Sequence, residues 1–248
     1  MKSDGIQSWH ERLWRTNNTA DIARGRVPGS RPFAAFGERV TTGAVASSIL
    51  WQTGMPTALT VPNAIQMSFA SSGTDTRRLK MVYLDDDLIE RHEIVTLNGT
   101  TAVLSQATDV RFINYMYSLD GAADRTVTVS SGGTTYALLN PSQTQFTQAA
   151  YRVPANRRLM LTSLYAGSVS GTSDSRVSVR VEVSFFNGDS FGAQGILHPV
   201  GGVGLQDSAT TLSFGPFPIP AGEIVALTLK CDKSADILGG FFGWTEDA

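Results

Sequence analysis

The chain is poor in the residues that most often supply cross-links and metal ligands. Among its 248 residues there are one cysteine, Cys231, and three histidines. A single cysteine excludes an intrachain disulfide and any zinc motif built on cysteine pairs. The histidines, His10, His92 and His198, lie far apart, and none of them forms an i, i+4 ligand pair. Stability is therefore expected to come from packing or from association with other chains.

Long apolar runs are missing as well. No stretch approaches the roughly 18 apolar residues that a membrane-spanning helix needs, so no membrane partner is expected. The first residues, 1–8, are charged but have no apolar segment behind them. Because a secretory leader requires such a segment, we expect the chain to be made in the cytoplasm and to carry no leader of its own.

Charge is sparse and nearly balanced. Charged residues make up 17% of the chain, below the average of about 25% for soluble proteins, and the formal net charge is −2. A surface built to bind nucleic acid is usually strongly basic, so nucleic acid is not an expected partner. Glycine, serine and threonine are abundant, which favours many short strands and turns over long helices. The composition thus predicts an all-β protein.

The clearest periodic signal is the stretch 176–186, RVSVRVEVSFF. Its apolar residues alternate with polar ones, which is the period expected of a half-buried antiparallel strand. Asn187-Gly188 follows it and favours a tight hairpin. Because a sheet with one wet face must cover its other face, residues 141–248 are predicted to form a β-sandwich or jelly roll. Its other expected strands are 149–153, 159–165, 196–200, 210–214, 223–231 and 237–244.

Asn140-Pro141-Ser142-Gln143 is the strongest boundary signal in the chain. Before it, alternating apolar residues and turn dipeptides predict a small antiparallel β domain over residues 51–140. Asn98-Gly99 is expected to join a strand at 89–97 to a return strand through Val103-Leu104. A further hairpin is expected to join strands at 126–130 and 135–139 through Ser131-Gly132-Gly133.

Residues 1–50 differ from the rest and are interpreted as an N-terminal arm. The capping box Ser8-Trp9-His10-Glu11 predicts a short helix from Trp9 to Arg15. Residues 17–35 show no sustained periodicity, which predicts an extended segment. Seven basic against four acidic residues give this part a charge of 7 − 4 = +3. A flexible tail and an arm that orders on a neighbouring, acidic subunit both fit, and the cost of leaving Trp9 and Trp14 in water favours the second.

Few patterns in the sequence point to catalysis or metal binding. Asp85, Asp86 and Asp87, with Glu90 and His92 nearby, supply the oxygens that hard cations prefer. However, neighbouring side chains on an extended chain point to opposite sides, so a solvated turn is the preferred interpretation.

Two glycine-rich stretches also fail as functional motifs. Residues 167–171, GSVSG, place Val169 where a nucleophile elbow needs serine. In the other, Gly202-Val203-Gly204, the third glycine of a dinucleotide fingerprint is replaced by Asp207. Cys231 alternates with apolar residues and is expected in the core. We therefore expect no enzyme activity, no cofactor and no bound metal.

Aromatic residues leave a different alternative open. Tyr115, Tyr117, Trp51 and Trp244 could together form a sugar-stacking platform, as on carbohydrate-binding sandwiches. In a β-rich chain, aromatic residues lie more often in the core.

A succession of motifs in the first half of the chain carries a resemblance. The run 67–75, MSFASSGTD, precedes a strand that ends in Leu84-Asp85, and the stretch 93–103, EIVTLNGTTAV, follows. This order resembles a group of tailed-bacteriophage virion proteins, in which Ser-Ser-x-x-Asp-Thr, a strand ending in Leu-Asp and a Val-Thr-Leu-Asn-Gly-Thr hairpin follow one another. Residues 151–156 and 237–244 are similar to later parts of the same proteins.

The resemblance spans roughly residues 50–248 and rests on turn motifs. The chain departs from the family pattern in Asn156, where the family often has glycine, and in its longer, arginine-bearing arm. The resemblance implies a virion structural protein, made in a bacterial host, that decorates or cements the capsid or attaches at the head-tail neck, collar or tail fibres. Its expected partners are copies of itself, as a dimer or trimer, and major capsid or neck and tail proteins. The expected contact residues are Trp9, Trp14, Arg24, Arg26 and Arg31.

A carbohydrate-binding module for a host surface glycan is the rival interpretation. It predicts an exposed row of aromatic residues. A glycosidase is a weaker third one, because nothing in the sequence singles out a pair of carboxylates at the required separation.

Overall fold

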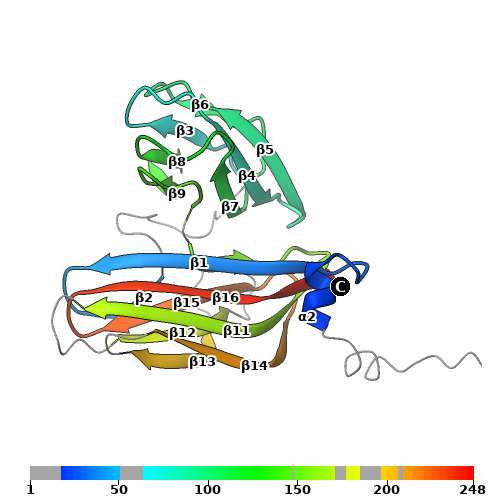
Figure 1. The fold of residues 1–248 in the computed structure, drawn as a ribbon. Coiled ribbons are helices and arrows are strands. Elements are labelled where there is room, and N and C mark those ends of the chain that lie inside the picture. The colour runs from blue at the N-terminus through cyan, green and yellow to red at the C-terminus, as the bar shows by residue number, and fades with distance from the viewer. Residues whose placement is uncertain (1–17, 51–63, 147, 171–176, 185–196, 206–208) are drawn as a thin grey trace, which may run out of the picture.

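The computed structural model describes residues 18–50, 64–146, 148–170, 177–184, 197–205 and 209–248. These ranges form sixteen strands and one short helix, α2 (Asn18–Ala23), which confirms the predicted all-β class. The helix predicted from Trp9 to Arg15 lies outside the described residues, and so does the turn predicted at Asn187-Gly188. Figure 1 shows a two-layered body below and a smaller β body above it.

The larger body is a sandwich of two antiparallel sheets. The first sheet has the strand order β1-β16-β11-β14, and the second has β10-β15-β12-β13, with β2 also paired to β15. Successive strands alternate between the sheets except at β12 and β13, which is a jelly-roll arrangement of eight strand positions with β2 and β10 sharing one position along β15. The strands are β1 (Arg31–Thr41), β2 (Val45–Ile49), β10 (Ala150–Arg152), β11 (Arg157–Ser170), β12 (Val177–Ser184), β13 (Leu197–Leu205), β14 (Ala209–Ile219), β15 (Ile224–Cys231) and β16 (Ala235–Asp247).

The interpretation of residues 1–50 as an arm is wrong for its second half. Strand β1 pairs with β16 along its whole length, from Arg31 opposite Thr245 to Thr41 opposite Ala235, and β2 pairs with β15. The segment RPFAAFGERVT carries a weak strand signal because alanines and a glycine interrupt its alternation. Its partner lies about 200 residues further along the chain, so tertiary pairing rather than local pattern makes it a strand.

The core of the jelly roll is filled by the inward side chains of both sheets. Phe33 of β1 packs between Tyr151 and Phe241, with ring centroids 4.4 and 5.6 Å away. Cys231 is buried in the same cluster and is a free thiol, as expected of a core residue. The fully buried aliphatic members include Leu50, Val153, Leu159, Leu161, Leu164, Ile219, Val225 and Leu227.

The smaller body is inserted between β2 and β10 of the jelly roll. We call residues 64–146 the insert domain. One of its sheets has the order β6-β3-β8-β9 and the other β5-β4-β7. Its strands are β3 (Ser68–Ser71), β4 (Arg78–Leu84), β5 (Glu90–Thr96), β6 (Val103–Leu104), β7 (Phe112–Ser118), β8 (Val127–Ser131) and β9 (Thr134–Leu139). Its core includes Met67, Phe69, Met81, Met116 and Leu139.

One predicted hairpin of the insert domain forms and another does not. Strands β8 and β9 pair across Gly132 and Gly133, which both have positive φ. In contrast, β6 pairs with β3 and β5 pairs with β4, so Asn98-Gly99 does not join two paired strands. The Gly99 amide instead donates to the Asp75 carbonyl, and the Gly99 carbonyl accepts from the Ser71 amide. These two hydrogen bonds therefore join the turn at residues 71–75 to the turn at Asn98-Gly99, and both turns belong to the motifs that carry the resemblance.

The insert domain is tied to the jelly roll by buried polar and apolar contacts. Asn114 of β7 donates to the Arg152 carbonyl and accepts from the Arg152 amide, both at 3.0 Å, and both residues are buried. The Ala155 amide also donates to the Leu88 carbonyl at 2.9 Å. A small apolar cluster of Leu84, Phe112 and Ile224 lies beside these bonds. The two bodies are thus joined by a specific interface.

Candidate functional site

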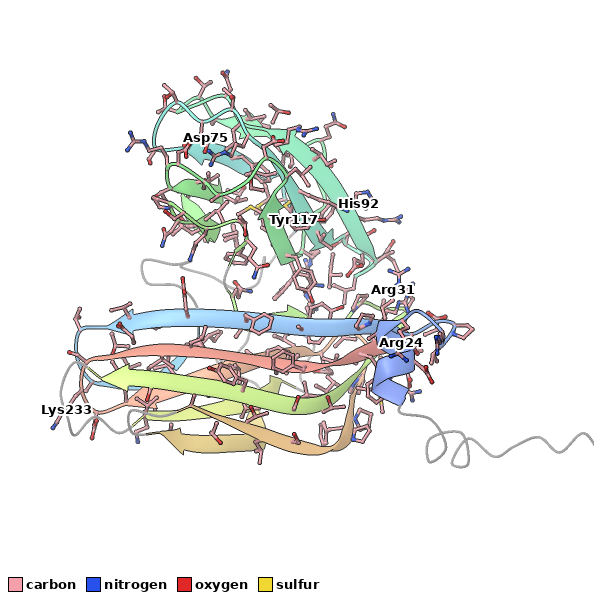
Figure 2. The ribbon with its side chains drawn as sticks, in the orientation of Figure 1. Arg24, Arg31, Asp75, His92, Tyr117 and Lys233 are labelled. Carbon is pink, nitrogen blue, oxygen red and sulfur yellow. The ribbon has the colours of Figure 1, made fainter. Side chains whose placement is uncertain are left out.

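The structure describes three of the five predicted contact residues, Arg24, Arg26 and Arg31. Trp9 and Trp14 lie outside the described residues. Arg24 and Arg26 are exposed in the loop after α2, where Arg26 forms an ion pair with Asp21 at 3.4 Å. Arg31 begins β1, and Figure 2 shows Arg24 and Arg31 at the same end of the jelly roll. What these residues contact remains a proposal.

Helix α2 ends in a turn that the sequence pattern did not indicate. The Gly25 amide donates to the Ile22 carbonyl, and the Arg26 amide donates to the Asp21 carbonyl. This pair of bonds is a Schellman motif, and it uses Gly25 at a φ of +68°. The turn satisfies carbonyls at the end of the helix, so it fixes the course of the chain from α2 toward β1.

The loop between α2 and β1 is held against the end of β16. The guanidinium of Arg157 donates to the Gly29 carbonyl at 2.6 Å and pairs with the Asp247 carboxylate at 2.9 Å. Gly29 has a φ of +76°, and a Cβ there would lie 2.6 Å from an oxygen of Asp247. Arg157 therefore anchors the N-terminal part of the described chain to the jelly roll.

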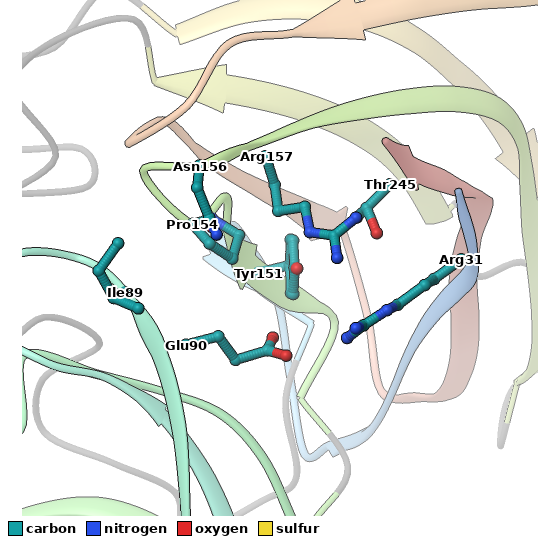
Figure 3. A pocket seen from close by; sticks show the side chains of 8 residues that line it. All are labelled: Arg31, Ile89, Glu90, Tyr151, Pro154, Asn156, Arg157 and Thr245. Carbon is teal, nitrogen blue, oxygen red and sulfur yellow. The ribbon is translucent and has the colours of Figure 1, made fainter. Parts of the chain in front are cut away.

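A pocket of about 180 Å³ opens where the insert domain meets the jelly roll. Figure 3 shows Arg31 and Glu90 pointing toward each other across it, from β1 and β5 respectively. Tyr151 contributes to the wall, and burial raises the pKa of its hydroxyl while Arg157 and Arg31 oppose that shift. The lining residues are Arg31, Ile89, Glu90, Tyr151, Pro154, Asn156, Arg157 and Thr245. Such a lining can hold a small polar group by hydrogen bonds.

The acidic cluster at the start of β5 is a structured turn. One carboxylate oxygen of Asp85 accepts from the amides of Asp87 and Ile89, at 3.1 and 2.8 Å, and the other pairs with Arg91 at 2.9 Å. Asp85 is buried, whereas Asp86 and Asp87 are exposed. Across the described ranges, no group of three or more His, Cys, Asp or Glu side chains is placed to hold a metal ion.

The three described members of the set considered for sugar stacking, Tyr115, Tyr117 and Trp244, do not gather on one surface. Trp244 is buried at one end of the jelly roll, and Tyr115 packs against the core with its ring 5.9 Å from that of Tyr151. Tyr117 lies in the insert domain, with Lys80 over its ring at 5.9 Å. Trp51 lies outside the described residues.

Several large apolar side chains are exposed on the outward side of the first sheet. We call Phe36, Val40, Leu238 and Phe242 the apolar face; they lie on one side of the adjacent strands β1 and β16. Phe36, Val40 and Leu238 are 38%, 54% and 46% exposed, and they are three of the six exposed large apolar side chains of the described residues. The ring of Phe36 meets that of Phe242 edge to face at 5.2 Å.

Two acidic residues border the apolar face. Glu38 lies opposite Leu238, and Asp236 lies opposite Val40, in the pairing of β1 with β16. Because side chains on one face of a strand recur every second residue, both carboxylates project on the same side as the apolar face. Glu38 also accepts a hydrogen bond from the Gln143 side chain, which comes from the end of the insert domain.

One end of the same side is already covered by the chain itself. Ile22 of α2 packs on Met160 and Trp244, all three are buried, and Val27 packs against them. Trp244 lies two residues beyond Phe242 on β16, so this cluster and the apolar face are neighbours on one side of the sheet. Figure 1 shows α2 at this end of the jelly roll.

The chain matches no model of a known protein family, and no curated protein matches its sequence. Among solved structures it is similar to one of the Gx strain of infectious bursal disease virus, at 12% identity over 88% of this chain and 73% of that chain, with a TM-score of 0.27. It is similar to a structure of broad bean stain virus at 11% identity over 77% of this chain and 85% of that chain, with a TM-score of 0.24. It is also similar to a CBM22 tandem domain of Paenibacillus barcinonensis Xyn10C at 11% identity over 85% of this chain and 93% of that chain, with a TM-score of 0.25.

TM-scores of this size do not establish a common fold, and nothing about function follows from them. The strand order described above defines the jelly roll independently of these similarities. In the part of the chain that the structure describes, no helix is long and apolar enough to cross a membrane.

Proposed function

We propose that the protein is a non-enzymatic structural subunit of a tailed-bacteriophage virion, which decorates or cements the capsid exterior through contacts between subunits. The observation that carries the proposal is the apolar face, where Phe36, Val40 and Leu238 are exposed on the outward side of the first sheet. Large apolar side chains exposed together on one side of a sheet indicate a surface that another chain covers. Covering it supplies association energy that a chain without disulfides can use for stability.

Two further observations support this function. The motifs that resemble phage virion proteins lie in the insert domain, and the structure joins them through the bonds between Gly99 and the residues Ser71 and Asp75. Asp75 is buried there, and its carboxylate accepts from the Arg77 amide at 3.1 Å. The jelly roll itself is an architecture that viral capsid domains share with lectin domains. Because one fold hosts many functions, the fold supports the proposal only as an analogy.

The proposal is tested by binding to virion parts. Capsids and tails of the encoding phage, assembled without this chain, would be incubated with the purified protein and separated by sedimentation. Soluble glycans serve as the control ligand. A variant lacking residues 1–17 probes the N-terminal segment and leaves β1 and β2 intact, whereas removing residues 1–50 would delete both strands.

We expect the full chain to sediment with capsids and to lose most of this binding when residues 1–17 are removed. Binding to tails or necks alone would replace capsid decoration by a neck, collar or tail-fibre role. Binding to glycans that is indifferent to the N-terminal segment would overturn the structural function in favour of a carbohydrate-binding module.

A further inference from the structure

We propose that the apolar face is the docking surface for residues 1–17 of a neighbouring copy of the same chain. The inference rests on the proposed function, because it names the partner through which copies would assemble. Each copy would supply residues 1–17 to one neighbour and its own apolar face to another segment. Exchange of such segments can close a dimer or a trimer without leaving a surface uncovered.

The first support is where the segment ends. Residue 17 adjoins α2, whose Ile22 already lies on Met160 and Trp244 at one end of the same side of the sheet. The chain itself thus covers one end of this side, and the surface from Phe242 to Leu238 stays open. That surface runs along four residue steps of β16, or about 13 Å. Seventeen residues can reach about 56 Å when extended, which is enough to arrive at a neighbour.

The second support is the chemistry of the segment. Its apolar side chains include Trp9, Leu13 and Trp14, and tryptophan is the side chain most enriched at the energetic centres of protein interfaces. The open surface offers Phe36 and Leu238, which are large enough to pack against an indole.

The third support is charge complementarity. Arg12 and Arg15 flank Leu13-Trp14 in the sequence, so cations stand on both sides of the apolar pair. Glu38 lies opposite Leu238 and Asp236 lies opposite Val40 in the structure, so two anions lie among the apolar side chains at one end of the open surface. Opposite charges at the rim of an interface fix its register and exclude wrong partners.

A cross-linking experiment tests the inference on the full chain. One copy carries Thr16→Cys and a short affinity tag, a second copy carries Leu238→Cys and a longer tag, and the two are expressed together. Both tryptophans of the segment stay in place, and cysteine keeps a small apolar side chain at position 238. A bis-maleimide linker is then added, and the products are separated on a denaturing gel. The natural Cys231 is only 3% exposed, so the parent protein is expected to give no product. Ser8→Cys paired with Val40→Cys repeats the test at a second position.

We expect a mixed dimer that carries both tags, formed at least about tenfold faster than with Ile94→Cys in place of Leu238→Cys. Ile94 is the matched control because it is also a large apolar residue, is 54% exposed and lies in the insert domain. Absence of the mixed dimer at both positions overturns the inference. A linked monomer from the double variant Thr16→Cys, Leu238→Cys, without a mixed dimer, overturns it too, because the segment would then cover its own sheet.

The same variants separate this inference from the proposed function. Their binding to capsids is measured before the linker is added. Capsid binding that persists without a mixed dimer overturns only the docking surface. A mixed dimer in a protein that binds no virion part keeps the docking surface and overturns the virion role.

Discussion

The insert domain and the first sheet of the jelly roll each have an exposed edge strand, β5 and β1, but the two strands expose different kinds of side chain. Strand β5 is an edge strand whose outer residues are mostly charged, with Glu90, Arg91 and His92 all exposed. Strand β1 is also an edge strand, but Phe36 and Val40 are exposed on its face. Charged side chains on an edge strand prevent it from pairing with other chains, whereas large apolar side chains exposed on one face indicate a surface that a partner covers.

The insert domain also carries ion pairs at its surface. In the insert domain, Arg78 pairs with Asp120 at 2.6 Å and Arg91 pairs with Asp85 at 2.9 Å. The single exposed Ile94 on β5 has charged neighbours along the strand, and isolated apolar residues of this kind are normal on soluble proteins. The insert domain also exposes Leu104 and Leu119, but its edge strand β5 presents mostly charged side chains, whereas β1 and β16 present the apolar face that we propose is covered.

Core truncation in the two bodies gives the largest expected effect. Phe241 of the jelly roll and Phe69 of the insert domain are both fully buried. Replacing either by alanine is expected to lower the free energy of unfolding by about 3–5 kcal/mol. Because both ends of the insert domain connect to jelly-roll strands, Phe241→Ala should destabilise the whole chain, and Phe69→Ala mainly the insert domain. Calorimetry of the two variants measures this, and identical transitions would show that the bodies unfold as one unit.

Loss of the polar link between the bodies ranks second. Asn114→Ala removes both bonds to Arg152 and leaves a buried amide and carbonyl without that partner. A buried polar group left unpaired costs about 1–3 kcal/mol. We expect the free energy of unfolding to fall by that amount and the melting curve to separate into two steps. Asn156→Ala is the control, since the Asn156 side chain is exposed, and it should leave the curve unchanged.

Substitution on the apolar face should hardly alter folding but should alter association. Leu238→Ser removes an apolar side chain that is already 46% exposed, so the free energy of unfolding is expected to change by less than about 1 kcal/mol. We expect the same substitution to shift the oligomer toward monomer in light scattering after gel filtration. Ile94→Ser is the matched change in the insert domain and should leave the oligomer intact. An equal loss in both variants would contradict the contrast between the bodies.

Sequence periodicity predicted the strands that alternate strongly and failed where tertiary pairing decides. The stretch 176–186 alternates valine with polar residues, and the structure has β12 there. Gly132 and Gly133 predicted their hairpin because positive φ is a local requirement. In β1, Ala34, Ala35 and Gly37 blur the alternation, and only pairing with β16 makes this segment a strand. No local signal reports a partner that far away in the sequence.

The candidate site was less accessible to prediction than the fold. Arg31 was singled out for its charge, and the structure places it at the pocket, but the apolar face was missed. Its residues come from segments about 200 positions apart, and each segment alone carries only two of them. The sequence does place Phe36 and Leu238 on the polar side of their own segments. That they share one surface becomes clear only once β1 is known to pair with β16. The contact roles of Trp9 and Trp14 stay predictions.

The smallest expected effect concerns the charged surface of the insert domain at low pH. Hydrogen bonds from Arg78 lower the pKa of Asp120 from 3.8 to about 2. A carboxyl with a lowered pKa in the folded state contributes stability that is complete above the unfolded value and is lost as pH falls toward the folded value. Asp120 therefore stabilises the chain above about pH 4, and this contribution disappears between about pH 4 and pH 2.

Asp120→Asn removes that contribution and should make stability less dependent on pH over this interval. The effect should be small and should shrink further in high salt, because the pair is exposed and its charges are screened. Chemical unfolding at pH values from 5 down to 2 measures it. Asp87→Asn removes one negative charge from an exposed turn of the same domain and should leave the pH dependence closer to that of the parent. If the two variants gave the same curve, the dependence would come from net charge rather than from the pairing of Arg78 with Asp120.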